Sequence, residues 1–146
     1  MISFEMNRKG LRAGDRIPER EVRRTLSAVA RILRLRTALR VSVAFPGATE
    51  MRRLNARYRG RRTPTDVLSF SLSPTEGEIL ICPSVARRQA RDLGHAFQKE
   101  VLFLLIHGVL HIVGHDHERS VDARRMFARQ NRILKTLGLD QPSLHV

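Results

Sequence analysis

Apolar residues recur along this chain with two different spacings, and each spacing predicts one type of element. Near the start, Ile2, Phe4 and Met6 alternate with polar residues, which is typical of a strand with one buried face. Further short apolar runs end at Pro, Gly or Ser, and the segment SPTEG predicts a hairpin between two of them. The predicted strands cover residues 2–6, 41–45, 67–72 and 78–82.

Spacings of three and four residues predict helices elsewhere. Val22, Leu26, Val29 and Leu33 form one apolar stripe on a helix that Pro18 opens. Four further helices are expected at about residues 48–58, 84–94, 96–113 and 119–137.

Residues with special backbone or side-chain properties predict where three of these helices begin or end. Ser84 follows Pro83 and is expected to cap the helix that ends near Gly94. Gly114 and Gly138 are expected to end the last two helices, because glycine adopts the left-handed conformation easily. Together the elements predict an α+β fold with a small mixed four-stranded sheet and about five helices.

The length of 146 residues predicts a single domain over residues 1–146. The first ten residues lack a basic segment followed by an apolar one, so we expect no signal peptide. The apolar run at 101–113 is too short for a bilayer, which predicts a buried helix, no membrane partner and a cytoplasmic protein. Cys82 is the only cysteine and is expected to be a buried thiol. The oligomeric state stays open.

The charge is strongly positive, with 27 Lys and Arg against 14 Asp and Glu and a net charge of +13. Six arginines fall within residues 52–62, and guanidinium groups bind phosphate in a bidentate geometry. Any single arginine here could simply be a solvated surface residue, but the total favours a nucleic-acid partner. Only seven aromatic residues are present, so stacking surfaces for bases are expected to be sparse.

The run HGVLHIVGHDH carries the pattern H-x-x-x-H-x-x-G-x-x-H. His107 and His111 are four residues apart, so on a helix both imidazoles lie on one face. Gly114 can end that helix and turn the chain so that His117 reaches the same ion. We interpret this pattern as a metal site rather than as a chance cluster of core histidines.

Three neutral imidazoles suit one zinc ion, which is usually tetrahedral. A fourth position would then remain for water, whose pKa zinc lowers to about 7. Structural zinc sites are commonly rich in cysteine, and the only cysteine here is far from the motif. The ligand set therefore predicts a catalytic site.

The motifs HGVLHIVGHDH, PTDVLSF and GEILIC make the chain resemble the YbeY family of bacterial endoribonucleases over nearly its whole length. The motif Leu-Asn-x-x-Tyr-Arg is also present and ends at Arg59. By this resemblance the zinc ligands would be His107, His111 and His117, on a metzincin-like zinc helix. Arg59 and His111 would be catalytic. The resemblance implies a zinc-dependent, single-strand-specific endoribonuclease that acts on rRNA and ribosomal particles, in 16S rRNA 3′ end processing and ribosome quality control.

Two positions depart from the family pattern. His115 stands where the family usually has tyrosine, so His115 and His117 both remain candidate ligands, and we favour His117. Glu78 stands where aspartate is more frequent in the family. Two neighbouring residues keep two interpretations each: Asp116 could orient a ligand histidine or cap a helix, and His95 could be a catalytic acid or a helix N-terminal residue.

Two other functions remain open. Metzincin proteases share the histidine spacing, but their motif has a glutamate general base directly after the first histidine, where this chain has Gly108. A zinc metalloprotease-like hydrolase is therefore disfavoured. A non-catalytic protein that binds rRNA or the ribosome would use the same positive charge with a structural metal.

Overall fold

The computed structural model describes residues 1–61, 65–114 and 120–139. A mixed sheet with strand order β1-β2-β4-β3 forms one layer. β1 (Ile2–Asn7), β2 (Leu39–Ala44) and β4 (Glu76–Ile81) are parallel, and β3 (Val67–Ser73) pairs antiparallel with β4. The described residues also form five helices: α1 (Glu19–Leu33), α2 (Ala48–Arg59), α3 (Pro83–Leu93), α4 (Phe97–Ile112) and α5 (Ser120–Thr136). The predicted α+β fold is confirmed.

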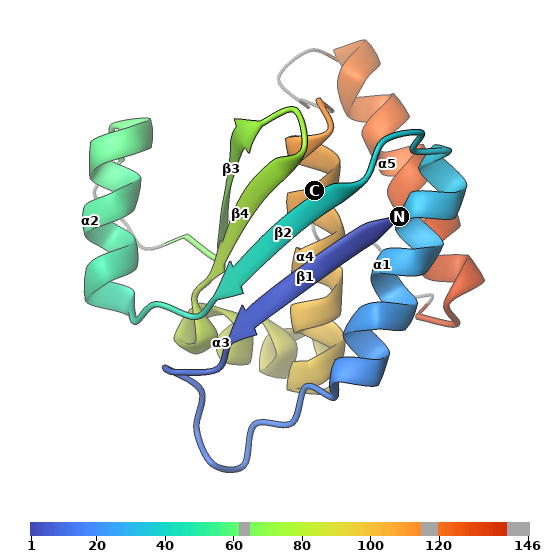
Figure 1. The fold of residues 1–146 in the computed structure, drawn as a ribbon. Coiled ribbons are helices and arrows are strands. Elements are labelled where there is room, and N and C mark those ends of the chain that lie inside the picture. Colours follow the sequence, from blue (N-terminus) through green and yellow to red (C-terminus); the bar gives the residue numbers. More distant parts are fainter. Residues whose placement is uncertain (62–64, 115–119, 140–146) are drawn as a thin grey trace.

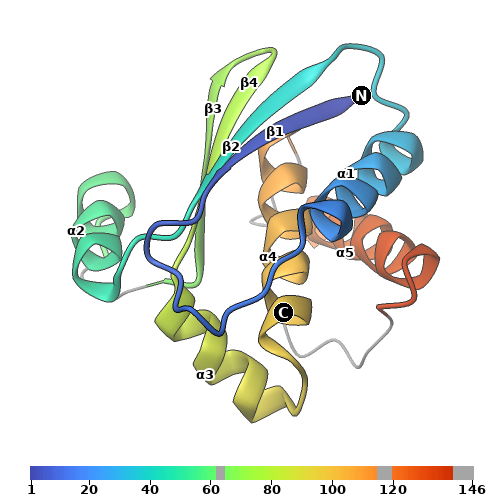
Figure 2. The same cartoon turned by 60° about the horizontal axis from the view of Figure 1, so that its bottom comes forward.

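The helices lie on both sides of the sheet. α1, α4 and α5 cover one face, and α2 lies on the other side next to the edge strand β3 (Figures 1 and 2). Met51 of α2 is fully buried in a small cluster with Leu68 of β3 and Leu80 of β4. This cluster fixes the N-terminal half of α2 beside the sheet.

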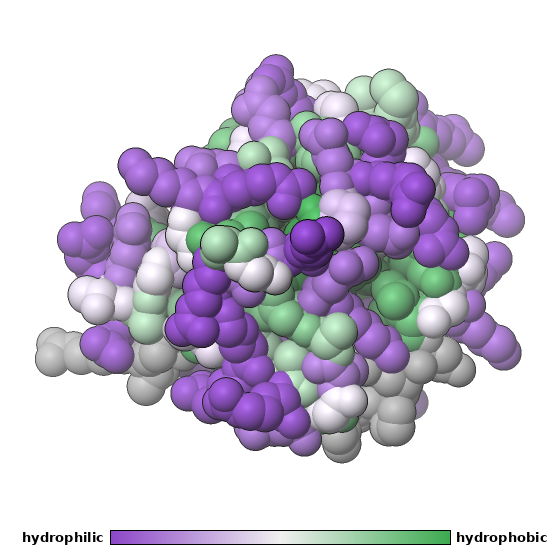
Figure 3. Space-filling model, turned by 90° about the horizontal axis from the view of Figure 1, so that it is seen from below, coloured by the Kyte–Doolittle hydropathy of each residue, from purple (hydrophilic) through white to green (hydrophobic). Residues whose placement is uncertain are grey.

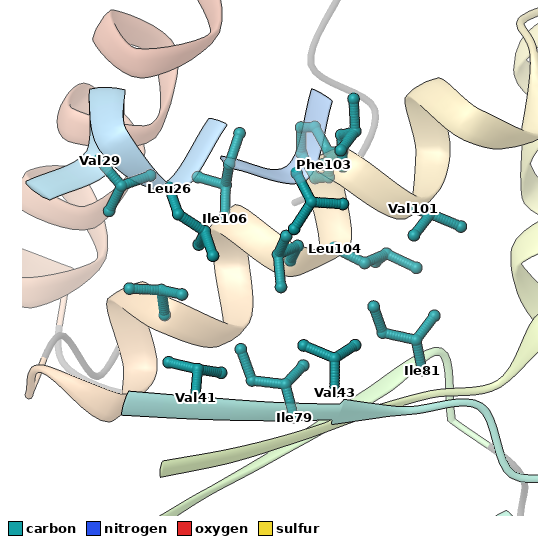
Figure 4. Packing of buried hydrophobic residues seen from close by; sticks show 14 of the residues in the cluster. Leu26, Val29, Val41, Val43, Ile79, Ile81, Val101, Phe103, Leu104 and Ile106 are labelled. Atoms are coloured by element: carbon teal, nitrogen blue, oxygen red, sulfur yellow. The ribbon is translucent and has the colours of Figure 1, made fainter. Parts of the chain in front are cut away.

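The main core lies between the sheet and α4. Figure 4 shows Val41, Val43, Ile79 and Ile81 projecting from the sheet toward this helix. α4 is apolar nearly all round, as expected for a helix surrounded by other elements. Burial of each such aliphatic side chain contributes about 1.5–3 kcal/mol, so α4 is held rigidly under the sheet.

Two glycines allow α4 to approach the sheet closely. A Cβ atom on Gly108 would lie 3.0 Å from two side-chain carbons of Ile79 in β4. A Cβ atom on Gly77 of β4 would lie 2.6 Å from the Cδ1 atom of Ile112. Gly108 therefore faces the sheet. His107 and His111 point in other directions around the same helix.

Three sequence-based predictions of element ends were wrong. β2 begins two residues earlier than expected, because the backbone of Leu39 and Arg40 is hydrogen-bonded to the segments on both sides. β4 spans Glu76–Ile81 rather than 78–82, which leaves a shorter hairpin turn. Ser84 does not cap α3. Proline fits the first helical position, so α3 begins at Pro83 and Cys82 is the N-cap residue.

Other local predictions are confirmed. Cys82 is fully buried, and α4 ends just before Gly114, whose φ is +98°. Within the residues that the structure describes, we find no helix with the length and apolar character needed to span a bilayer.

Candidate active site

His107 and His111 lie together on the last turns of α4. Their Nε2 atoms are 3.1 Å apart, and both side chains are only partly buried. Two nitrogens that bind one zinc ion at about 2.0–2.1 Å in tetrahedral geometry are separated by about 3.3 Å. The observed spacing is close to this value, so the two residues fit a shared divalent cation.

Gln130 of α5 orients one of these rings. The Nδ1 atom of His107 lies 3.2 Å from Oε1 of Gln130, a side chain that is only 1% exposed. An amide oxygen only accepts, so Nδ1 of His107 must carry the proton. The Nε2 atom of His107 then carries the lone pair and faces Nε2 of His111. This is the usual arrangement around a metal-binding histidine.

His117, its competitor His115 and the neighbouring Asp116 lie outside the described residues. Within the described ranges, no group of three His, Cys, Asp or Glu side chains is placed to hold a metal ion. The fit to a cation therefore rests on the donor chemistry and spacing of His107 and His111.

A cavity of about 490 Å³ opens beside the two histidines. It lies where α4 meets β3, α3 and the C-terminal end of α2, and its lining combines positive, negative and apolar side chains. The described residues that line it are Arg59, Arg61, Thr65, Asp66, Val67, Ser69, Gln89, Asp92, Leu93, Phe103, Leu104, His107 and His111.

Arg59 reaches this cavity from the last turn of α2. Gly60 follows it with a φ of +68°, and its N–H donates to the carbonyl of Ala56, which ends the helix. Arg61 then also lines the cavity. The structure therefore brings Arg59 to the same cavity as His107 and His111, although their segments are far apart in the sequence.

Sequence reasoning missed the carboxylate and amide side chains of this cavity wall. Asp66 precedes β3, and its Oδ1 accepts from the backbone N–H of Val67 at 2.8 Å. Its Oδ2 accepts from the side-chain amide of Gln89 at 3.3 Å. Asp92 lines the same cavity. Asp66 lies within the quoted PTDVLSF motif, but Gln89 and Asp92 belong to an arginine-rich helix whose pattern gave no signal.

Gln130 was also missed, although its sequence position carries a signal. Met126, Ile133 and Leu137 are buried residues of the last helical segment and its end, and Gln130 falls in the same stripe. A polar residue in a buried apolar stripe needs a hydrogen-bond partner. In this chain that partner is a candidate metal ligand.

His95 occupies a different place. Its Nε2 atom lies 2.6 Å from Oε1 of Glu100, and these side chains are 9% and 0% exposed. His95 precedes α4, whereas His107 lies near the other end of that helix. His95 is not among the described residues of the cavity lining, so the geometry favours its role near the N-terminus of α4.

The molecular surface is strongly polar. Figure 3 shows hydrophilic side chains over most of the described surface on one face, with smaller hydrophobic patches between them. Arg52, Arg53, Arg57, Arg59 and Arg61 are exposed on or just after α2. A polyanion that approaches the cavity from this side meets several positive charges.

Comparison with known proteins agrees with the site. The family model described as Endoribonuclease YbeY matches residues 3–138. The chain belongs to the YbeY family. It is similar to endoribonuclease YbeY of Bacillus pumilus, with 36% identity over 139 residues that cover 84% of this chain and 87% of that protein. Endoribonuclease YbeY of Staphylococcus carnosus is 40% identical over 111 residues, covering 68% of this chain and 72% of the relative.

A solved structure supports the same assignment. The solution structure of TM1509 from Thermotoga maritima matches with a TM-score of 0.61 and 26% identity, and the match covers 100% of this chain and 99% of that one. The resemblance noted in the sequence is therefore confirmed, and so is the enzyme class that it implies, a metal-dependent endoribonuclease.

Proposed function

We propose that this YbeY family member cleaves single-stranded RNA in a zinc-dependent reaction, with the full chain, residues 1–146, acting as one catalytic domain in the cytoplasm. Its proposed substrates are rRNA and ribosomal particles, in 16S rRNA 3′ end maturation and ribosome quality control. The observation that supports this proposal best is the shared cavity of Arg59, His107 and His111, with two imidazole nitrogens 3.1 Å apart.

One zinc ion would be held by His107, His111 and His117. When bound, zinc supplies a more acidic water molecule and a Lewis acid for the scissile phosphate. Gln130 holds the His107 ring in the tautomer whose Nε2 atom carries the lone pair. Because Gln130 is buried and belongs to a different helix, it also fixes the angle of that ring.

Arg59 and Arg61 would bind the RNA backbone. Both guanidinium groups reach the cavity from the end of α2, and a guanidinium can contact two phosphate oxygens at once. Charge that develops on the phosphate during cleavage is stabilised by such a fixed cation. Asp66 and Asp92 line the same cavity and repel phosphate, so the backbone is directed toward the arginines.

The protease alternative is weakened by the position of Gly108. The glutamate base of a metzincin occupies this motif position, and here the position faces Ile79 of the sheet. A carboxylate there would be buried in the core rather than placed in the cavity. The other alternative, a protein that binds rRNA without cleaving it, is distinguished from an RNase by a cleavage assay.

The test is cleavage of a structured RNA with a single-stranded tail, with and without chelator. We expect loss of cleavage with chelator and in His111→Ala, together with loss of bound zinc in that variant. Arg59→Glu should reduce cleavage strongly, whereas Arg31→Glu on the exposed side of α1 makes the same charge change away from the cavity and should not. Binding of RNA without any metal-dependent cleavage would favour the binding protein, and cleavage of casein would favour the protease.

A further inference from the structure

Tyr58 is an exposed aromatic residue in the last turn of α2. Its side chain is 55% exposed, although Met51 on the same helix is fully buried and attaches α2 to the sheet. The Tyr58 ring contacts Phe70 of β3 with a centroid distance of 5.2 Å and an interplanar angle of 66°. This edge-to-face contact holds the ring in place while more than half of its surface remains accessible.

The aromatic pair lies beside the cavity. Tyr58 directly precedes Arg59, and Phe70 directly follows Ser69, and both of those neighbours line the cavity. Side chains of successive strand residues point to opposite faces, so Phe70 projects to the face that α2 covers while Ser69 faces the cavity. A chain leaving the cavity over the edge strand β3 would meet the Tyr58 ring.

The charge around this ring suits a nucleic acid. The guanidinium carbon of Arg57 lies 5.4 Å from the Tyr58 ring centroid, and the Arg57 side chain is exposed. When a base stacks on the Tyr58 ring, the long Arg57 side chain moves aside, and its guanidinium group then contacts the neighbouring phosphate. An exposed ring with arginines on both sides in the sequence combines a stacking surface with backbone contacts, as in proteins that bind single strands.

We infer that Tyr58 is a stacking platform for an unpaired base of the RNA, one or more nucleotides from the phosphate bound in the cavity. This inference rests on the proposed function and adds a physical reason for single-strand selectivity. A base in a duplex has both faces stacked, whereas a base in a single strand can offer a face to Tyr58. Although the chain has few aromatic residues, one of them, Tyr58, is therefore placed to stack on a base.

The amino-acid composition gives a direct readout. Tyr58 is the only tyrosine and the chain has no tryptophan, so the intrinsic tyrosine fluorescence reports this one ring. The protein is titrated with a short single-stranded oligoadenylate, with an abasic chain of the same length, and with the same sequence as a duplex. We expect strong quenching by the oligoadenylate and little by the other two. Unchanged fluorescence while labelled oligoadenylate binds would overturn the inference.

Variants provide the second measurement. Tyr58→Ala should weaken oligoadenylate binding about tenfold and leave binding of the abasic chain unchanged, whereas Tyr58→Phe should keep the affinity. Leu72→Ala is the matched control, because Leu72 is a large apolar residue that is 60% exposed on β3, and it should bind like the parent chain. Equal affinities of Tyr58→Ala and the parent chain for oligoadenylate would refute the platform.

The outcomes separate the inference from the proposed function. Quenching by oligoadenylate without cleavage would refute the proposed RNase and retain the platform. Cleavage of RNA by a Tyr58→Ala variant with unchanged affinity would refute the platform and retain the RNase. Absence of any RNA binding would refute both.

Discussion

At the scale of single residues, the site depends on hydrogen bonds that fix the imidazoles before any cation arrives. His107 and His111 are four residues apart on a rigid helix, so their separation is set by helix geometry. The orientation of each ring is not set in this way. For His107 it is set by Gln130, which lies on another helix.

Gln130→Leu is therefore expected to weaken zinc binding by about 10–100-fold, because the His107 ring loses its acceptor and samples other orientations and tautomers. The measurement is competition for zinc against a fluorescent chelator. Gln130→Glu keeps an acceptor at the same place and should restore most of the affinity. Equal zinc affinities of Gln130→Leu and the parent chain would show that Gln130 does not orient His107 for zinc binding.

Gly108 tests the distinction from proteases. Gly108→Glu is expected to lower the free energy of unfolding by about 3 kcal/mol or more, since the new side chain meets Ile79 and buries a carboxylate against the sheet. Urea unfolding measures this change. A stable Gly108→Glu protein that gains peptidase activity would show that position 108 reaches the cavity, contrary to the present account.

At the scale of elements, one ion pair connects three segments around the start of α4. Arg87 of α3 donates to Asp15 at 2.6 Å, and its guanidinium lies 5.2 Å from the ring centroid of Phe97 at the start of α4. Burial alone would raise the pKa of the Asp15 carboxyl. The hydrogen bond from Arg87, the backbone N–H of Arg12 and the charges of both arginines outweigh it and lower that pKa.

Asp15→Asn should destabilise the protein by about 1–3 kcal/mol at neutral pH, because a charge-assisted hydrogen bond is lost. A carboxyl with a lowered pKa in the folded state stabilises fully above the pKa of the unfolded chain, about 3.9, and loses this effect as pH falls through the folded value. The stability difference between parent and variant should therefore shrink below about pH 4. Unfolding midpoints measured across this range check it, and a constant difference would contradict it.

The elements themselves were largely predictable, because their burial follows local patterns. The stripe Val22, Leu26 and Val29 and the apolar run of α4 are buried as expected. The strand ends at Leu39 and Glu76 were not predictable, since they depend on pairing with strands distant in the sequence.

The candidate site was predictable only where local sequence patterns determine it. His107 and His111 share one short motif, so local geometry brings them together. Asp66, Gln89 and Gln130 come from three other segments, and only the folded arrangement of β3, α3 and α5 places them near the histidines. The helical spacing of Met51, Leu54 and Tyr58 predicts that all three face inward, and for Tyr58 this prediction is wrong: its side chain is 55% exposed.

At the scale of the whole molecule, the net charge of +13 attracts any RNA without regard to sequence. Such attraction raises the local concentration of RNA, but it does not place a phosphate in the cavity. Specific placement requires arginines that are fixed at the cavity wall, and Arg59 and Arg61 are the described arginines that line it.

Salt dependence separates these contributions. Each phosphate contact to a single strand contributes about −0.7 to the slope of log affinity against log salt. Arg59→Ala is expected to make this slope less negative by about 0.7, and Arg31→Ala should change it less, because Arg31 lies away from the cavity on α1. Fluorescence anisotropy of labelled RNA at several salt concentrations measures both slopes. Identical slopes for Arg59→Ala and the parent chain would exclude a phosphate contact at Arg59.

The central claim is that His107, His111 and His117 hold one zinc ion with a coordination position left for water. The most direct measurement is the metal content of the purified protein together with X-ray absorption at the zinc edge. We predict one zinc per chain with three nitrogen ligands and one oxygen ligand. A protein that binds no zinc, or a zinc ion whose four ligands are all side chains of the protein, would contradict this account.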